Sequence, residues 1–145
     1  MPIQLDVVTL ERSVYSADDV DMVVVPGSEG VMGILPNHAP VVTALKAGVL
    51  EIIRGENREQ LAIGGGFVQI TGKQVVVLAD AAEHGDEIDA ERAQQARQRA
   101  EKDLAEATDT MDRDRALAAL HRAQARLQVS RKRRGSSGRE GARID

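Results

Sequence analysis

The chain has 145 residues and a formal net charge of −4, and its only Phe, Tyr or Trp residues are Tyr15 and Phe67, so aliphatic side chains must fill any core. It contains no cysteine, which excludes disulfide bonds and thiolate chemistry. No apolar run approaches the ~20 residues that a membrane-spanning helix needs, and the first residues do not show the basic and then apolar pattern of a secretory signal. The composition predicts a cytosolic chain without direct membrane insertion, which can still attach to the periphery of a membrane complex.

Short β-branched runs fill the first half of the chain. They cover residues 3–7, 20–25, 49–53, 61–63, 67–70 and 75–78, and glycine and proline punctuate them. Such runs predict an all-β sandwich or barrel. Because no helix of useful length lies between them, a parallel doubly wound sheet is disfavoured.

Two glycine-containing strings in this half are interpreted as structural. Residues 64–66, Gly-Gly-Gly, match neither a P-loop nor a dinucleotide fingerprint, and they predict a glycine-rich turn or a point of close backbone packing. Residues 30–40, GVMGILPNHAP, predict a strand, a turn fixed by two prolines and another strand. The structural residues of this second string are Gly30, Gly33, Pro36, His38 and Pro40.

Alanine and charged residues replace glycine near residue 88. Apolar residues then recur every three or four positions in two stripes: Ala93, Ala96, Ala100, Leu104 and Ala107, and then Ala116, Leu120, Ala123 and Leu127. Residues 108–110 interrupt the stripes, so the pattern predicts an antiparallel helical hairpin. Alanine offers few of the buried CH₂ groups that are each worth ~0.8 kcal/mol, so weak docking that permits movement is expected. The predicted units are a sandwich over 1–86, a helical hairpin over 87–134 and a disordered tail over 135–145.

Charge is distributed unevenly between these units. Residues 1–88 carry 13 acidic and 5 basic groups, whereas residues 89–134 carry 8 acidic and 12 basic groups. The basic excess indicates either attraction to an acidic partner or a solvated helix surface. The Arg131–Arg134 cluster could contact nucleic acid, but it lacks interleaved aromatic residues, so a solvated or partner-facing helix end is favoured.

No catalytic constellation is visible. The three histidines are scattered through different predicted elements without metal-ligand spacing, and no cysteine assists them. The chain is therefore predicted to be neither an enzyme nor a metal protein.

One group of charged residues has the character of a ligand site. Arg122 and Arg126 are four residues apart on one helix face, where two guanidinium groups can clamp a polyphosphate. Asp89 and Glu83 could accept from an adenine amino group or a ribose hydroxyl. The structural alternative, which spacing alone favours, is that Asp89 caps a helix and pairs with Arg92 or Arg126. The full candidate set is Glu83, Ile88, Asp89, Arg92, Ala93, Arg122 and Arg126.

The sequence resembles the epsilon chain family of bacterial F-type ATP synthases over about residues 3–133. The matching strings, in order, are LDVVT at 5–9 with Glu11-Arg12, then residues 30–40, and AGVL at 47–50. The resemblance implies an α+β multidomain chain, with an N-terminal all-β ten-stranded sandwich followed by a C-terminal antiparallel two-helix hairpin.

The resemblance also implies a role in the rotor. The sandwich would bind the gamma subunit and the c-ring at the cytoplasmic face of the bacterial cell membrane, coupling proton flow to ATP synthesis while other subunits hold the catalytic sites. The helices of such chains can extend into the catalytic head of alpha and beta subunits and restrain ATP hydrolysis. The residues expected to contact beta are Arg113, Arg115, Arg122 and Arg126.

Some bacterial members of the family bind ATP in the hairpin form through an Ile/Leu-Asp-x-x-Arg-Ala motif. Residues 88–93 satisfy that motif in full, and Glu83, Arg122 and Arg126 match further positions of the same site. The resemblance thus implies ATP as a regulatory ligand, with no required cofactor, and ATP bound across both helices would favour the hairpin.

Other readings remain open at this point. A stand-alone ligand-binding β-sandwich would ignore a gamma subunit, and a nucleic-acid-binding protein would show salt-dependent binding. An enzyme would need a nucleophile, metal or acid–base pair that the sequence does not display.

Overall fold

The computed structural model describes residues 2–144, with side chains described for residues 2–130. The strands are β1 (Ile3–Val8), β2 (Ser13–Val20), β3 (Met22–Gly27), β4 (Gly30–Ile34), β5 (Val41–Arg54), β6 (Asn57–Thr71), β7 (Gln74–Ala79) and β8 (Ala82–His84). The 3₁₀ turn η1 (Gly85–Glu87) and the helices α1 (Ala90–Glu106) and α2 (Thr110–Ile144) follow. The predictions for the 135–145 tail and for the Arg131–Arg134 cluster fall outside the described side chains and stay predictions.

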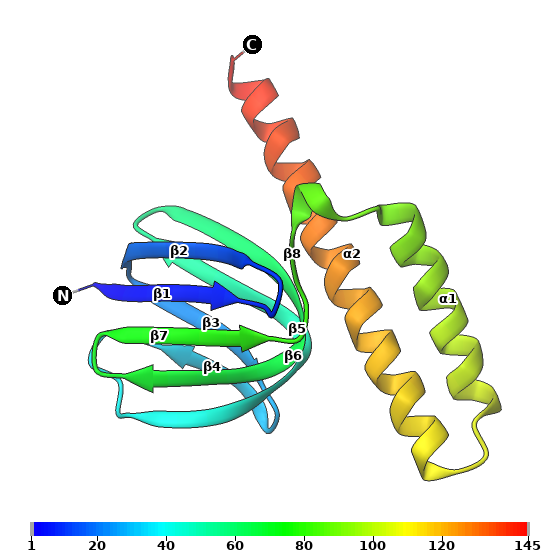
Figure 1. Cartoon of the computed structure of the whole chain (residues 1–145). Coiled ribbons are helices and arrows are strands. Elements are labelled where there is room, and N and C mark those ends of the chain that lie inside the picture. The colour runs from blue at the N-terminus through cyan, green and yellow to red at the C-terminus, as the bar shows by residue number, and fades with distance from the viewer. Residues whose placement is uncertain (1, 145) are drawn as a thin grey trace.

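The strands pair along one path, β2-β1-β7-β6-β5-β3-β4, and β8 pairs with β6. β5 and β6, with 14 and 15 residues, are long enough to bend from one layer into the other. Residues 66–71 of β6 pair with β7 in one layer, and residues 61–63 pair with β8 in the other. If each half of β5 and β6 is counted separately, the sandwich has ten strand segments, five in each layer. The predicted sandwich followed by two helices is confirmed (Figure 1).

The bend in β6 corrects one prediction about the strands. Residues 61–63 and 67–70 were predicted as separate strands, yet pairing with β5 continues on both sides of the glycines. Gly65 and Gly66 have φ angles of 106° and 138°, which glycine adopts without strain. A Cβ at Gly66 would lie 2.1 Å from the carbonyl oxygen of Leu78. Close backbone packing inside a bent strand, and not a turn between strands, explains this string.

The string 30–40 runs from a hairpin turn to the start of β5. Gly30, with φ 142°, opens β4, and a Cβ at Gly33 would lie 2.7 Å from the Met22 methyl group. After β4, His38 N–H donates to the Leu35 carbonyl oxygen at 3.2 Å, which closes the turn that contains Pro36. Pro40 directly precedes β5.

Aliphatic side chains fill the space between the two layers. The buried cluster contains Ile, Leu, Val and Ala residues from β1 to β8, and Tyr15 packs only against its edge. Phe67 remains 55% exposed. The core is therefore aliphatic, as the composition requires.

The two helices form an antiparallel hairpin in which α2 lies between α1 and the sandwich (Figure 1). A second, smaller apolar cluster joins this hairpin to β6, and its members are Ala62, Ile88, Ala93, Ala125, Leu127 and Val129. Three of these six residues are alanine, so little apolar surface is buried at this junction. None of the helices in the described part of the chain is long and apolar enough to span a membrane.

Candidate functional site

A polar cleft lies where the sandwich meets the helical hairpin. It has a volume of about 500 Å³, which is within the range of small-molecule sites. Its lining comes from β8, η1, the first three turns of α1 and one residue of α2. The lining residues are Glu83, Glu87, Ile88, Asp89, Arg92, Ala93, Gln95, Ala96, Arg99 and Arg126.

The start of α1 forms one wall of this cleft. Asp89 caps the helix, because its Oδ1 accepts from Arg92 N–H at 3.2 Å and its carbonyl accepts from Ala93 N–H at 3.0 Å. Ile88, just before the cap, is buried in the cluster with Ala62 and Ala93. An apolar anchor followed by a polar cap therefore fixes where the helix begins and leaves Arg92 exposed on the wall.

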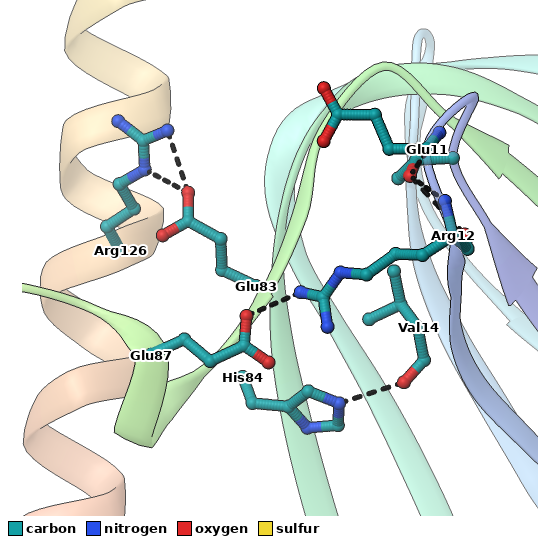
Figure 2. Close-up of polar contacts among 8 residues, drawn as sticks. Glu11, Arg12, Val14, Glu83, His84, Glu87 and Arg126 are labelled. Atoms are coloured by element: carbon teal, nitrogen blue, oxygen red, sulfur yellow. Dashed lines mark hydrogen bonds and ion pairs between the residues drawn. The ribbon is translucent and has the colours of Figure 1, made fainter.

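The opposite wall carries an ion pair between β8 and α2. Arg126 Nε donates to Glu83 Oε1 at 2.8 Å, and Arg126 Nη2 forms an ion pair with the same oxygen, also at 2.8 Å (Figure 2). The two side chains are 36% and 28% exposed. Glu83 therefore engages Arg126, and an anionic ligand would compete with that carboxylate for it.

Six of the seven candidate residues line this one cleft, although they come from three elements. The exception is Arg122. It lines a small neighbouring cavity together with Gly64, Ala81 and the Glu83–Arg126 pair, and its Cδ lies 3.6 Å from the Cβ position of Gly64. Arg122 and Arg126 thus share a helix face and this small cavity, but only Arg126 also lines the cleft.

Four lining residues were missed by sequence reasoning, and three of them, Gln95, Ala96 and Arg99, extend the wall of α1. Gln95 and Arg99 follow Arg92 at intervals of three and four residues, so they lie on its helix face. That spacing could have identified them. Glu87 could not have been identified in this way, because its place in the cleft depends on the η1 turn.

The charges of the cleft are balanced. Three carboxylates face it, and two of these are already paired: Glu83 with Arg126, and Glu87 with Arg12 from the β1–β2 turn. Arg92 and Arg99 are exposed cations on the α1 wall, so they could receive the anionic part of a ligand. Among the described residues, no group of three or more His, Asp or Glu side chains could hold a metal ion.

The four arginines expected to contact a beta subunit do not form one patch in the hairpin. Arg113 and Arg115 are exposed near the start of α2, and Arg115 Nη2 lies 3.7 Å from the sulfur of Met111. Arg122 and Arg126 are half-buried beside the sandwich. At 1.5 Å per residue, Arg113 and Arg126 are about 20 Å apart along the helix.

Family models for the two parts of this architecture match the chain in order. The model described as ATP synthase, delta/epsilon chain, beta-sandwich domain matches residues 2–85, and the long alpha-helix domain of the same chain matches residues 86–131. The chain belongs to the ATP synthase delta/epsilon chain family.

Bacterial members of this family are similar over nearly the whole chain. The ATP synthase epsilon chain of Dehalococcoides mccartyi strain BAV1 is 48% identical over 133 residues, covering 91% of this chain and 94% of its own. The ATP synthase epsilon chain of Desulforamulus reducens is 46% identical over 127 residues, covering 88% and 96%. A chain in the structure of the Euglena gracilis mitochondrial ATP synthase, OSCP/F1/c-ring, has a TM-score of 0.74 at 26% identity, covering 88% of this chain and 79% of that one.

Proposed function

We propose that this chain is a non-catalytic central-stalk subunit of an F-type ATP synthase, which couples proton translocation to ATP synthesis as part of the rotor. The observation that carries the proposal is the ordered match of both delta/epsilon domain models over residues 2–131. The related epsilon chains are bacterial, so we place the chain at the cytoplasmic face of the cell membrane, bound to the periphery of the complex. Its partners would be the gamma subunit and the c-ring, with the alpha and beta subunits met by the helices.

An apolar stripe on the outer face of the sandwich supports docking to another subunit. Val8 lies opposite Leu78, Leu78 opposite Phe67, and Phe67 opposite Ala44, so the four side chains form a row across four strands. Leu78 and Phe67 are 51% and 55% exposed. Val42, on the same face of β5 as Ala44, is 65% exposed. An apolar row of this kind on a sheet that is already packed on its other face marks a protein contact, which we assign to the gamma subunit.

Capture of a gamma subunit by the chain tests the rotor role. The double variant Phe67→Ser/Leu78→Ser should weaken capture roughly tenfold or more, since buried aromatic anchors dominate interface energies. Met111→Ser is the matched control, because Met111 is 65% exposed at the far tip of the hairpin. Failure of the unmodified chain to capture gamma would contradict the proposal, and salt-dependent binding to nucleic acid instead would favour the rival function.

We also propose that the helices regulate the enzyme by moving between the hairpin and an extended form. The small alanine-rich junction favours detachment, and an extended α2 would present Arg113, Arg115, Arg122 and Arg126 to an acidic segment of a beta subunit. ATP would act as the regulatory ligand by binding in the cleft between α1 and α2. A ligand that contacts both helices stabilises the hairpin only to the extent that it binds this form more tightly than the extended one.

Support for ATP binding comes from the convergence of six candidate residues on one cleft of suitable size. Asp89 keeps one carboxylate oxygen for a donor group of the base or ribose, because its cap bond to Arg92 N–H uses Oδ1. Phosphates would be received by the exposed Arg92 on one wall and by Arg126 on the other, displacing Glu83.

Calorimetric titration of the isolated chain with ATP tests this site. We expect saturable 1:1 binding, weakened at least tenfold in Arg126→Ala, because a hydrogen bond to a charged group is worth ~1.5–3 kcal/mol. Arg58→Ala is a suitable control, since Arg58 pairs with Glu51 on the sandwich at 2.9 Å and does not line the cleft. Absence of binding at millimolar ATP would leave the rotor role intact and reduce the cleft residues to structural or beta-contacting ones.

A further inference from the structure

The η1 turn contributes to the lining of the cleft, but the interactions within the turn stabilise its conformation only weakly. Its backbone hydrogen bond, from Ile88 N–H to Gly85 O, is 3.4 Å long. No side chain caps the turn at His84, and none of its three residues is buried. A single 3₁₀ turn with such poor internal bonding depends on contacts from other elements for its position.

Two of those contacts come from the hairpin of β1 and β2. Arg12 Nη2 pairs with Glu87 Oε2, the last residue of η1, at 2.5 Å. His84 Nε2, directly before η1, donates to the carbonyl oxygen of Val14 at 2.9 Å (Figure 2). The β1–β2 hairpin therefore holds η1 at both ends, through contacts that span 75 and 70 residues of sequence.

The turn that carries Arg12 is itself well fixed. Thr9 N–H donates to the Arg12 carbonyl oxygen at 2.9 Å, and Thr9 Oγ1 accepts from Glu11 N–H and Arg12 N–H at 3.3 Å each. The turn that presents Arg12 to η1 is thus held by hydrogen bonds of its own.

The Arg12–Glu87 pair also changes the electrostatics of the cleft. Glu87 lines the cleft, and its carboxylate would repel the phosphates of a nucleotide. Arg12 does not line the cleft, but its guanidinium group pairs with the Glu87 carboxylate and offsets the negative charge of that group. Ile88 and Asp89 follow Glu87 directly, so a displacement of Glu87 would also displace Asp89, the cap of α1.

We propose that Arg12 is a positioning residue for the nucleotide cleft: it fixes η1 and the first turn of α1, and it masks the charge of Glu87. Nucleotide affinity then depends on a turn of the sandwich that the nucleotide never touches. The affinity part of this proposal rests on the proposed ATP site, whereas the positioning part does not.

Amide hydrogen exchange on the full, nucleotide-free chain tests the positioning part. In Arg12→Gln, the amides of Ile88 and Arg92 should exchange several-fold faster than in the unmodified chain, while amides within β6 keep their rates. Arg58→Gln, which breaks the Glu51 pair away from η1, should change neither Ile88 nor Arg92. Unchanged exchange at Ile88 and Arg92 in Arg12→Gln would overturn the proposal.

ATP titration tests the affinity part. Arg12→Gln should bind ATP about three- to fivefold more weakly, the range expected for loss of one exposed ion pair. Arg12→Lys, which keeps the charge, and Arg12→Gln/Glu87→Gln, which removes the lone carboxylate, should each recover most of the affinity. Equal affinity in Arg12→Gln and the unmodified chain would overturn the link to the nucleotide. If the unmodified chain binds no ATP, the proposed ATP site fails, and hydrogen exchange still decides whether Arg12 positions η1.

Discussion

At the scale of single residues, Gly66 decides whether the sandwich can close. Its φ of 138° belongs to glycine, and the missing side chain would point at the Leu78 carbonyl oxygen from 2.1 Å. Because that oxygen belongs to the backbone of the paired strand β7, it cannot move aside without breaking the sheet. The position therefore tolerates neither a side chain nor a different φ.

We expect Gly66→Ala to lower the free energy of unfolding by more than about 3 kcal/mol, since it combines a steric clash with a strained φ. Urea unfolding measures the change. Gly55→Ala isolates the conformational part, because Gly55 has φ 60° but no atom within 4 Å of its Cβ position, and it should cost only ~1 kcal/mol. Equal losses in the two variants would show that the clash is relieved by movement of β7.

Residue pairing across the fold could not be predicted from spacing. Arg54 donates to both carboxylate oxygens of Asp19, 35 residues away, at 2.9 and 3.0 Å, and this hydrogen bonding lowers the pKa of Asp19. Arg126 with Glu83 and Arg12 with Glu87 are separated by 43 and 75 residues. The sequence identified Glu83 and Arg126 as candidates through helix spacing, ligand chemistry and a family resemblance, whereas nothing local indicated that they would pair.

At the scale of elements, both helices begin with an aspartate cap. The sequence named Asp89 as a possible helix cap and placed the break between the two helices at residues 108–110. Asp89 Oδ1 accepts from Arg92 N–H at 3.2 Å, and Asp109 Oδ1 accepts from Asp112 N–H at 2.7 Å. The caps are chemically alike, but only Asp89 lines the cleft.

This likeness provides a matched test of the role of Asp89. Asp89→Ala and Asp109→Ala should each destabilise the start of one helix by ~1 kcal/mol, seen as faster exchange of the first-turn amides. Only Asp89→Ala should also weaken ATP binding in calorimetric titration. If both variants bind ATP equally well, Asp89 is a helix cap and not a ligand-binding residue.

The limits of β6 differ from those that the sequence predicted. Glycine usually ends a strand pattern, so β6 was predicted as two pieces. Pairing with β5 continues past Gly64 to Gly66 because these glycines let the strand bend while keeping its register. Whether a glycine interrupts or bends a strand depends on the neighbouring strand, which the local pattern does not contain.

At the scale of the whole molecule, the two apolar clusters differ in size and place. The large one lies wholly between the layers of the sandwich, and the small one joins the sandwich to the helices. The ion pairs Glu83–Arg126 and Arg12–Glu87 are both accessible to solvent and add only about 1 kcal/mol each. Detachment of the helices would therefore leave the core of the sandwich intact, which is what a movable regulatory arm requires.

The uneven distribution of charge between the two halves of the chain is also partly explained at this scale. The sequence left open whether the basic second half seeks an acidic partner or is merely solvated. Part of the answer is internal, since Arg126 of the basic half pairs with Glu83 of the acidic half. Arg113 and Arg115 remain exposed and available to another subunit.

The sequence by itself determined the fold class, the change from strands to helices near residue 88, the aliphatic core and the family. These depend on periodicity, on glycine and proline, and on motifs that lie within short stretches. Only the tertiary structure decided that Arg122 lines a neighbouring cavity and not the cleft, that Glu87 lines the cleft, and that Arg12 pairs with Glu87. The physical reason is that local patterns fix the direction of a side chain within its own element, whereas its partners depend on how the layers close on one another.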